Sequence, residues 1–424
     1  MILFLYNAGL LLLLIAMAPL LLLRPRWREG LRERLGAGAA WVAGGLRGVR
    51  PVWVHAVSVG EVIAVSRLVE ELDAHLGRGA VVISTTTRTG QRLARERFGQ
   101  QRCFYFPLDL PWVARAAVRV LRPRLLLLAE SELWPNVLTV CERERVPVLV
   151  VNARISDRSL PRYQRLQTLW QPFLRKLTLV LAQSEEDARR FVAIGVPPEH
   201  VRVGGNLKYD ARPPRLCALA QQVRAGLDSA ARVVVAGSTL ENEEAVLLQA
   251  WPAICSQTPD AVLVLAPRHP ERFDRVVVLA REYGAKLIRR SMWHGGAVAP
   301  GTVFLLDSIG ELAGMYGLAD VAFVGGSLVA AGGHNPLEPA RFGKPVLMGP
   351  HYENFRDAVD LLEAASALKI VDRDSISATM VALLADSARA SAMGARGRTV
   401  FAQQAGATER AVSAALHLMN EARS

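Results

Sequence analysis

Residues 52–61 read VWVHAVSVGE, an apolar run that leads through a turn of small residues into a segment with helical periodicity. The run Val52–His55 is short and rich in valine, which is typical of a strand buried on both faces of a sheet. A helix is predicted to follow over Val62–His75. Strand and helix units of this kind build parallel sheets, because successive parallel strands need a crossover connection.

The same unit recurs along the chain. In the first half, further strands are predicted at Ala80–Thr85, Leu125–Ala129, Val146–Val151 and Leu177–Ala182. After the stretch KYDARPP at 208–214, where paired prolines predict a linker, strands are predicted at Ala231–Gly237, Ala261–Ala266, Lys286–Arg289, Val303–Leu306, Val321–Gly325, Pro345–Met348 and Lys369–Val371. Residues 388–424 look helical. We therefore expect an α/β fold with two doubly wound, Rossmann-like domains that face a cleft and bind ligands at the carboxyl ends of their strands.

Composition excludes several classes of protein. The chain has 424 residues, of which 51% are hydrophobic and 21% charged, so it is neither disordered nor of low complexity. Its four cysteines form no CxxC pair, which argues against a disulfide framework or a thiolate zinc site. The net charge of +12 raises the possibility of nucleic-acid binding, but no basic patch alternates with aromatic residues, so we expect none.

The N-terminus predicts a membrane anchor. Residues 1–23 carry no charged side chain, and a helix of this length spans about 34 Å, enough for a hydrocarbon core of about 30 Å. Seven arginines and two glutamates follow in residues 24–50. Basic residues after the apolar run favour an uncleaved anchor over a signal peptide, with the rest of the chain in the cytoplasm. A buried apolar helix is the alternative. The predicted division is 1–23, 24–212 and 213–424.

Three groups of polar residues in the first half follow predicted strands or tight turns. Glu61 is either a general base at the edge of the sheet or a carboxylate that favours the positive end of a helix dipole. In ESELWPN, 130–136, Glu130 and Glu132 could stabilise a positive centre or hold a sugar hydroxyl, or else Ser131 or Glu132 caps the next helix. Lys208 follows a glycine turn and could reach a phosphate or carboxylate, although exposed loop lysines are common.

The second half has comparable segments. Arg268 and His269 follow a strand, and a guanidinium held there suits phosphate recognition. Glycines at 325, 326, 332 and 333 leave room for a ligand, and Asn335 and Glu338 could form a capping pair or, in a nucleotide-sugar enzyme, contact ribose hydroxyls. The D-x-D pattern at 372–374 is interpreted as a turn that precedes a helix rather than as a metal site.

Taken together, six segments in order resemble the 3-deoxy-D-manno-octulosonic acid (Kdo) transferases of Gram-negative bacteria. They are HAVSVGE at 55–61, ESELWPN at 130–136, NARISDRS at 152–159, GNLKYD at 205–210, APRHPERF at 266–273 and GGHNPLEPA at 332–340. Members of this family are membrane-anchored, inverting glycosyltransferases of GT-B fold that move Kdo from CMP-Kdo to a lipid A precursor.

The resemblance implies a role for each matching residue. Glu61 would be the proton acceptor, and Glu130 and Lys208 would stabilise the transition state. The CMP-binding residues would be Arg268, His269, Ile309, Gly310, Glu311, Asn335, Pro336, Leu337 and Glu338, with Gly326 and Ser327 in support. The resemblance also implies lipid IVA as acceptor, no metal or other cofactor, and a place on the cytoplasmic face of the bacterial inner membrane. The alternative is another membrane-associated GT-B transferase that uses a UDP-sugar.

Overall fold

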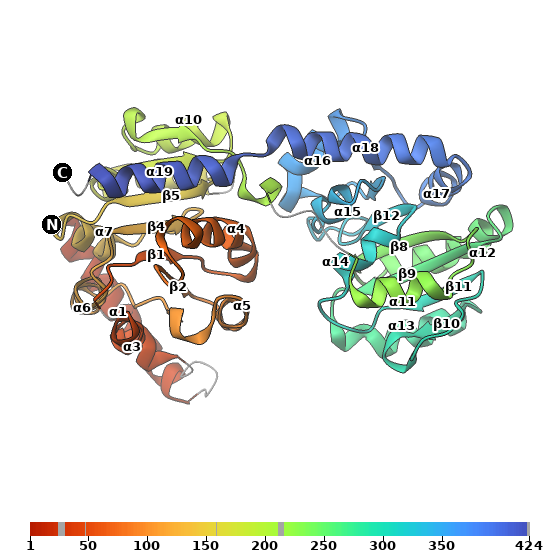
Figure 1. The fold of residues 1–424 in the computed structure, drawn as a ribbon, viewed down its shortest axis with the longest axis horizontal. Helices are drawn as coiled ribbons and strands as arrows, with labels where there is room; N and C mark the ends of the chain where they lie inside the picture. The colour runs from red at the N-terminus through yellow and green to blue at the C-terminus, as the bar shows by residue number, and fades with distance from the viewer. Residues whose placement is uncertain (24–29, 47, 158, 211–215, 422–424) are drawn as a thin grey trace. The chain divides into compact units, whose positions relative to one another are not determined.

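The computed structural model describes residues 1–23, 30–46, 48–157, 159–210 and 216–421. The chain divides into two compact units, one made of residues 1–211 and 404–424 and the other of residues 212–403. Each unit contains a parallel sheet with helices on both faces (Figure 1). The prediction of two doubly wound, Rossmann-like α/β domains is confirmed.

Within the described residues, the sheet of the first unit has seven parallel strands in the order β3-β2-β1-β4-β5-β6-β7. They are β1 (Val52–His55), β2 (Val81–Thr85), β3 (Cys103–Tyr105), β4 (Leu125–Ala129), β5 (Val148–Ala153), β6 (Leu179–Ala182) and β7 (Val201–Val203). Strand β1 lies between β2 and β4, since Trp53 is paired with Val82 on one side and with Leu126 on the other. Both neighbours of β1 therefore end at the same edge as β1 itself.

Alternate residues of these strands face two different cores. Val52 and Val54 pack in a core with α4 (Val59–Leu76), α5 (Arg88–Phe98) and α19 (Ala407–Glu421). Trp53 points to the opposite face, where the core includes side chains of α3 (Gly38–Gly45), α6 (Pro111–Leu121), α7 (Pro135–Arg143), α9 (Gln167–Leu174) and α10 (Glu185–Ala193). The unit also contains two short helices, α8 (Leu160–Arg165) and the 3-10 helix η4 (Leu207–Asp210).

The second sheet repeats this arrangement. Its described strands are parallel in the order β10-β11-β9-β8-β12-β13-β14. They are β8 (Arg232–Thr239), β9 (Ala261–Pro267), β10 (Lys286–Arg289), β11 (Thr302–Leu305), β12 (Val321–Val324), β13 (Val346–Met348) and β14 (Leu368–Ile370). One face is covered by α12 (Glu243–Gln257), α13 (Phe273–Glu282), α17 (Ile376–Ala385) and the start of α18 (Ser387–Gln404). The other carries α11 (Ala218–Gly226) and α14 (Leu312–Met315), while α15 (Leu337–Arg341) and α16 (Arg356–Ala364) follow β12 and β13.

The C-terminal helix corrects the predicted division of the chain. Residues 388–424 were expected in the second domain, but α19 belongs to the first unit (Figure 1). Its apolar face, which includes Ala411, Ala415 and Leu418, is buried in the core that it shares with α4. Burial of that face explains the placement, because an amphipathic helix is stabilised mainly by the packing of its apolar side.

Helix α1 (Ile2–Leu23) covers most of the predicted membrane span. Among the residues whose side chains the structure describes, however, no helix is both long and apolar enough to cross a membrane. Ile2 and Leu3 pack against the core of the first unit, and the Tyr6 hydroxyl donates to Asp109 Oδ2 at 3.0 Å. The arginines at positions 24, 26 and 28, which the anchor prediction used, lie outside the described residues.

Candidate functional site

The first unit places its predicted catalytic residues at one edge of the sheet. Glu61 lies in the first turn of α4, which follows β1, and Glu130 comes directly after the neighbouring strand β4. The carboxyl ends of parallel strands meet at the same edge, so the sequence segments that follow them are brought close together. Electrostatic repulsion from Glu130 is one of the causes that raise the pKa of Glu61, which is consistent with this proximity.

Glu61 is buried and held by two hydrogen bonds. Its Oε2 accepts from the backbone N–H of Val57 at 2.8 Å, and its Oε1 accepts from the Ser58 hydroxyl at 3.0 Å. These contacts tie the carboxylate to the start of the helix, where the helix-dipole interpretation also places it. Burial, reinforced by the charges of Glu130 and Glu132, nevertheless raises the pKa of Glu61 to about 7. A carboxyl group with that pKa can accept a proton near neutral pH.

Glu130 and Lys208 lie close to each other. The distance between Lys208 Nζ and Glu130 Oε1 is 4.0 Å, and both side chains are about one-third exposed. Glu130 adopts a left-handed backbone conformation with φ of 60°, which is strained for a residue with a side chain. Strain of this kind often marks functional positions, because the surrounding structure must hold it in place.

Three side-chain amides, those of Asn152, Gln183 and Asn206, form hydrogen bonds that hold the backbone around Lys208. The backbone N–H of Leu207 donates to Asn152 Oδ1 at 3.0 Å, and the backbone N–H of Lys208 donates to Asn206 Oδ1 at 3.0 Å. Gln183 completes the series, because its Nε2 donates to the Asn152 carbonyl and its Oε1 accepts from Asn206 Nδ2. The buried Asn152 has φ of 55°, the second left-handed residue at this edge of the sheet.

The helix that follows ESELWPN is not capped by that motif, contrary to one interpretation of the sequence. Ser131 donates its hydroxyl to the carbonyl of Arg154. The start of α7 is capped instead by the buried Asp109, whose Oδ2 accepts from the N–H of Asn136 at 3.0 Å and whose Oδ1 accepts from that of Val137 at 2.9 Å. Glu130 and Glu132 are therefore not used as caps, and repulsion between them contributes to the raised pKa of Glu132 after the larger effect of burial.

The predicted donor-binding residues of the second unit also follow adjacent strands. Arg268 and His269 come after β9, Ile309–Glu311 after β11, and the glycine-rich segment after β12, with β8 between β9 and β12. Arg268 is exposed, and its backbone N–H is held by the carbonyl of Thr239 at 2.9 Å. Burial raises the pKa of Glu338, and the positive charge of Arg268 is among the smaller effects that oppose this shift. Arg268 and Glu338 therefore belong to one local site.

The start of α15 carries the Asn335 and Glu338 pair. Asn335 Oδ1 accepts from the backbone N–H of Leu337 at 3.1 Å, so its side chain closes a turn before α15, whose N-cap position is Pro336. Glu338 does not reach back to the backbone in a capping box, because its Oε1 faces Asn335 Nδ2 at 3.5 Å. Its carboxylate therefore keeps acceptor capacity for a donor such as a hydroxyl group.

The three remaining residues predicted to bind CMP, Ile309–Glu311, differ in how firmly the protein holds them. Glu311 is held by Arg290, whose Nε and Nη2 both lie 3.2 Å from its carboxylate oxygens. Ile309 is 68% exposed, and Gly310 has φ of 92°, a conformation that favours glycine. In this segment the side chain of Ile309 is therefore exposed, whereas the carboxylate of Glu311 is held in place.

Gly326 and Ser327 were expected in a supporting role, and their polar groups are bonded within the protein. Glycine at 326 was expected to leave room for a ligand, but the backbone N–H groups of Gly326 and Ser327 both donate to the carboxylate of Glu243. The hydroxyl of Ser327 donates to the carbonyl of Val324 at 2.6 Å. These groups shape the loop from within the protein, so they are not available to a ligand in this conformation.

One residue near the donor segments was missed by sequence reasoning. His334 follows the glycines at 332 and 333, and its buried Nε2 has no hydrogen-bond partner among the described residues. Burial, followed by the charges of Arg268 and His269, lowers the pKa of His334 to about 4. The side chain is therefore a neutral imidazole at physiological pH, able to donate or accept one hydrogen bond at Nε2. Its signal was present in GGHN, but no role was assigned to it.

The D-x-D pattern is a turn, as interpreted. Asp372 Oδ1 accepts from the backbone N–H of Asp374 at 3.2 Å and from that of Ser375 at 2.8 Å, directly before α17. Within the part of the chain that the structure describes, no three His, Cys, Asp or Glu side chains are grouped so as to hold a metal ion.

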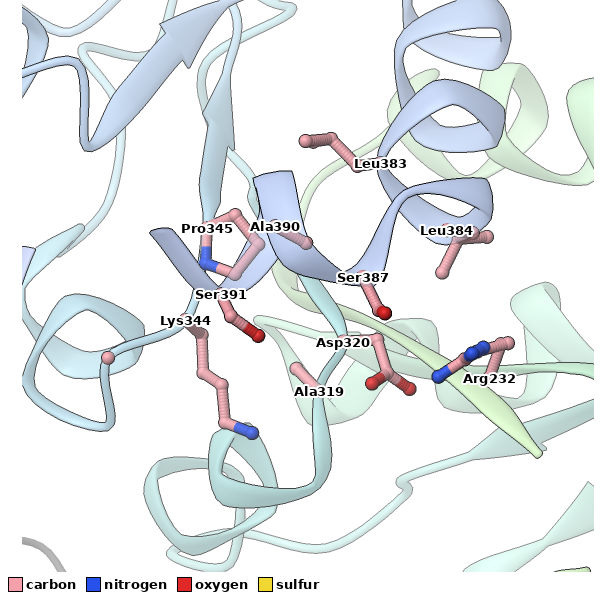
Figure 2. A pocket seen from close by; sticks show the side chains of 11 residues that line it. Arg232, Ala319, Asp320, Lys344, Pro345, Leu383, Leu384, Ser387, Ala390 and Ser391 are labelled. Carbon is pink, nitrogen blue, oxygen red and sulfur yellow. The ribbon is translucent and has the colours of Figure 1, made fainter. Parts of the chain in front are cut away.

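A small cavity lies at the opposite edge of the second sheet (Figure 2). It is lined by residues that precede or begin strands, including Arg232 of β8, Asp320 before β12 and Pro345 before β13, and by the start of α18. The Asp320 carboxylate accepts from the backbone N–H of Val233 at 2.7 Å. The cavity contains none of the predicted site residues, which all follow the other ends of the strands.

The comparisons with known proteins agree with this arrangement. The family model described as 3-deoxy-D-manno-octulosonic-acid transferase (kdotransferase) matches residues 29–211. The 3-deoxy-D-manno-octulosonic acid transferase of Haemophilus influenzae is 34% identical over 390 residues, which are 91% of this chain and 90% of the relative. That of Bordetella pertussis is 37% identical over 379 residues, 86% of either chain.

Solved structures show the same two-unit fold at low identity. UDP-GlcNAc 2-epimerase from Neisseria meningitidis has a TM-score of 0.58 and 13% identity, covering 88% of this chain and 100% of its own. MurG from Acinetobacter baumannii has a TM-score of 0.53 and 14% identity, covering 86% and 98%. The epimerase and MurG establish only the fold, whereas the similarity to the two curated transferases extends over most of either chain. On that similarity, this chain belongs to the 3-deoxy-D-manno-octulosonic acid (Kdo) transferase family.

Proposed function

We propose that this Kdo transferase moves Kdo from CMP-Kdo to a lipid A precursor, lipid IVA, with inversion at the anomeric carbon. The observation that carries the proposal is the buried Glu61, a carboxyl group with a pKa of about 7 at the carboxyl edge of the first sheet. An inverting transfer needs one base that removes the proton of the acceptor hydroxyl as its oxygen attacks the sugar. The bond between the anomeric carbon and the CMP phosphate breaks, and CMP leaves.

Lys208 and Glu130 would act on the charges that develop during this step. Positive charge builds up on the sugar ring and negative charge on the leaving phosphate. The carboxylate of Glu130 and the ammonium group of Lys208 lie 4.0 Å apart. The carboxylate can stabilise the positive charge on the sugar ring, and the ammonium group can stabilise the negative charge on the phosphate. The strained backbone at Glu130 and the amide series under Lys208 support a site that is held in position before the substrate arrives.

The second unit would bind CMP-Kdo. Arg268 supplies an exposed guanidinium for the phosphate, together with His269, and Glu338 would accept hydrogen bonds from ribose hydroxyls. Ile309–Glu311 and Asn335–Leu337 would complete the CMP contacts. The positive charge of Arg268 would neutralise the leaving phosphate without a metal ion, so we propose that the enzyme needs no metal.

A membrane location follows from the lipid acceptor. We propose that the enzyme acts on the cytoplasmic face of the bacterial inner membrane, supported by the uncharged residues 1–23 and the arginines that follow them in the sequence.

The decisive experiment measures Kdo transfer from CMP-Kdo to lipid IVA by mass spectrometry of the product, in EDTA and in magnesium. We expect product in both, with similar turnover. Loss of turnover in EDTA that magnesium restores would contradict the metal-free mechanism. Absence of product, with transfer from a UDP-sugar instead, would favour the alternative, and competition of CMP against UDP for binding separates the two donors directly.

A further inference from the structure

The first residue of α12 is a glutamate inside a cluster of backbone N–H groups. Glu243 is fully buried, with 0% of its side chain exposed. Its Oε2 accepts from the N–H of Gly326 at 2.7 Å and from that of Leu240 at 2.8 Å. Its Oε1 accepts from the N–H groups of Ser327 and Leu328, both at 2.9 Å. Three of the four donors are consecutive residues after β12.

Consecutive backbone N–H groups that converge on one point form a concave anion-binding site, which in many enzymes receives a phosphate. In this protein the side chain of Glu243 occupies it. A buried carboxylate is costly unless its oxygens are satisfied, and four hydrogen bonds satisfy this one. The loop at 325–328 is therefore built around a negative charge that the protein itself supplies.

The shape of this loop determines where the donor segment begins. The carbonyl of Gly326 accepts from the N–H of Gly333 at 2.7 Å, and the carbonyl of Gly325 accepts from that of His334 at 3.1 Å. Gly326 has φ of 70°, and a Cβ at this position would lie 2.8 Å from the His334 ring. Glu243 thus fixes the loop against which residues 333–338 are placed.

The next residue, Glu244, holds the segment that carries Arg268. Glu244 is also fully buried; its Oε2 accepts from Arg272 Nη2 at 3.0 Å, and its Oε1 accepts from the Thr239 hydroxyl at 3.1 Å. The Thr239 carbonyl in turn accepts from the backbone N–H of Arg268. Two adjacent carboxylates on one helix therefore hold two of the three segments that carry the predicted CMP contacts.

We propose that Glu243 and Glu244 are positioning residues for the donor, with Glu243 as an internal anion that preorganises the loop at 325–328. This inference rests on the proposed donor site in the second unit. It assigns no contact with the substrate to either residue.

The test compares Glu243→Gln with Glu241→Gln. Glu241 is exposed at the same turn and pairs with Arg272 and Arg275, so its variant removes the same charge without touching the N–H cluster. We expect Glu243→Gln to weaken CMP binding at least tenfold and to raise the donor KM, with the acceptor KM unchanged. Amide hydrogen exchange should accelerate at 326–334 but not in the strands of either sheet. The control should stay within twofold of the parent in CMP affinity, donor KM, acceptor KM and exchange rate.

Chemical rescue provides a second test. Glu243→Ala leaves the four N–H groups without their carboxylate, and added acetate or formate should restore CMP affinity and slow exchange at 326–328. Chloride at the same ionic strength should do neither. If Glu243→Gln does not fold, Glu243→Asp keeps the charge on a side chain shorter by one methylene and should show the same changes to a smaller extent.

Two outcomes are distinguished by these measurements. CMP affinity within threefold of the parent, with unchanged exchange at 326–334 in the Gln and Asp variants, overturns the inference. A parent protein that fails to bind CMP contradicts the proposed function instead. In that case the exchange measurements and the acetate rescue of loop protection still decide whether Glu243 organises the loop.

Discussion

The ammonium group of Lys208 lies 4.0 Å from the carboxylate of Glu130, although 78 positions separate them in the sequence. Lys208 stands on the 3-10 helix η4 that follows β7, and Glu130 directly follows β4. The pair forms only because parallel strands bring both segments to one edge of the sheet. Since each side chain is about one-third exposed, the pair contributes little to stability, about 0–1 kcal/mol.

Lys208→Met should therefore separate catalysis from stability. We expect turnover to fall by about 10²–10³-fold, the usual effect of losing a group that stabilises transition-state charge. The melting temperature and CMP affinity should barely change, because the pair is weak and the donor residues belong to the other unit. Lys176→Met is the matched control, since Lys176 pairs with Glu142 away from the predicted site. Equal turnover losses in the two variants would contradict the role of Lys208.

Glu61→Gln tests the general base. The amide keeps the size of the side chain but cannot take the acceptor proton, so we expect turnover to fall by about 10²–10⁴-fold with CMP affinity unchanged. In the parent, turnover should rise with pH and level off above a pKa of about 7. Turnover of Glu61→Gln within threefold of the parent would remove Glu61 as the base and leave Glu130 or Glu132 as candidates.

The same carboxyl group predicts a change of stability with pH. Burial raises the pKa of Glu61 from 4.5 to about 7, so between these pH values the folded protein holds a proton that the unfolded chain releases. The free energy of unfolding should therefore decrease as pH rises through this window, by on the order of 1–3 kcal/mol from this group.

Glu61→Gln has no such titration, so its free energy of unfolding, measured with urea at pH 5 and pH 8, should depend less on pH than that of the parent. Glu71→Gln is the control on the same helix, because Glu71 pairs with Arg67 at the surface. A pH dependence identical in Glu61→Gln and the parent would show that Glu61 titrates normally.

The sequence predicted the sheets better than the details of the site. Long apolar runs such as Leu125–Ala129 matched their strands, but β3 and β7 were missed. Both are strands of three residues at opposite edges of the sheet. The residues of β3 are apolar and buried but form only a short run, whereas the side chains of β7 are largely exposed. Edge strands are defined by the neighbour that they pair with, which a local pattern does not contain.

Site residues were found where a polar side chain follows a strand, as for Glu61 and Arg268. Residues that hold other site residues in position did not follow this pattern. Three of the four hydrogen bonds of Glu243 join positions more than 80 residues apart. Asn152 supports Lys208 through a bond to its neighbour Leu207, 55 residues along the chain. Such long-range contacts arise only when the sheet has formed, so no local pattern around Glu243 predicts them.

Arg268→Ala should weaken CMP binding without loss of fold. Removing a charge-assisted contact to a phosphate costs about 1.5–3 kcal/mol, or roughly a 10- to 100-fold rise in Kd. Arg268→Lys should recover part of the affinity, because it keeps the charge but loses the fork of donors. Arg275→Ala, at an exposed position of α13, is the control. The pKa of His334, followed by NMR, should rise in Arg268→Ala, since the charge of Arg268 helps to lower it. An unchanged Kd would place the phosphate elsewhere.

Asp210 connects the C-terminal helix to the segment that carries Lys208. Its Oδ1 accepts from the backbone N–H of Gly406 at 2.7 Å, and its Oδ2 accepts from that of Thr408 at the start of α19. In the opposite direction, Arg410 Nε donates to the carbonyl of Gly204 at 2.9 Å. The carboxylate is buried, and it satisfies N–H groups that the first turn of a helix leaves without partners.

Asp210→Asn should destabilise the first unit by about 1–3 kcal/mol, because the amide NH₂ cannot accept from an N–H group and leaves it unpaired. It should also lower turnover, since residues 204–210 hold Lys208, while CMP affinity stays within twofold of the parent. Glu409→Gln is the control, because Glu409 is an exposed acid in the same turn of α19. Urea unfolding, turnover and CMP titration on both variants provide the measurements. A loss of CMP affinity as large as the loss of turnover would show that Asp210 acts on the whole molecule rather than on Lys208.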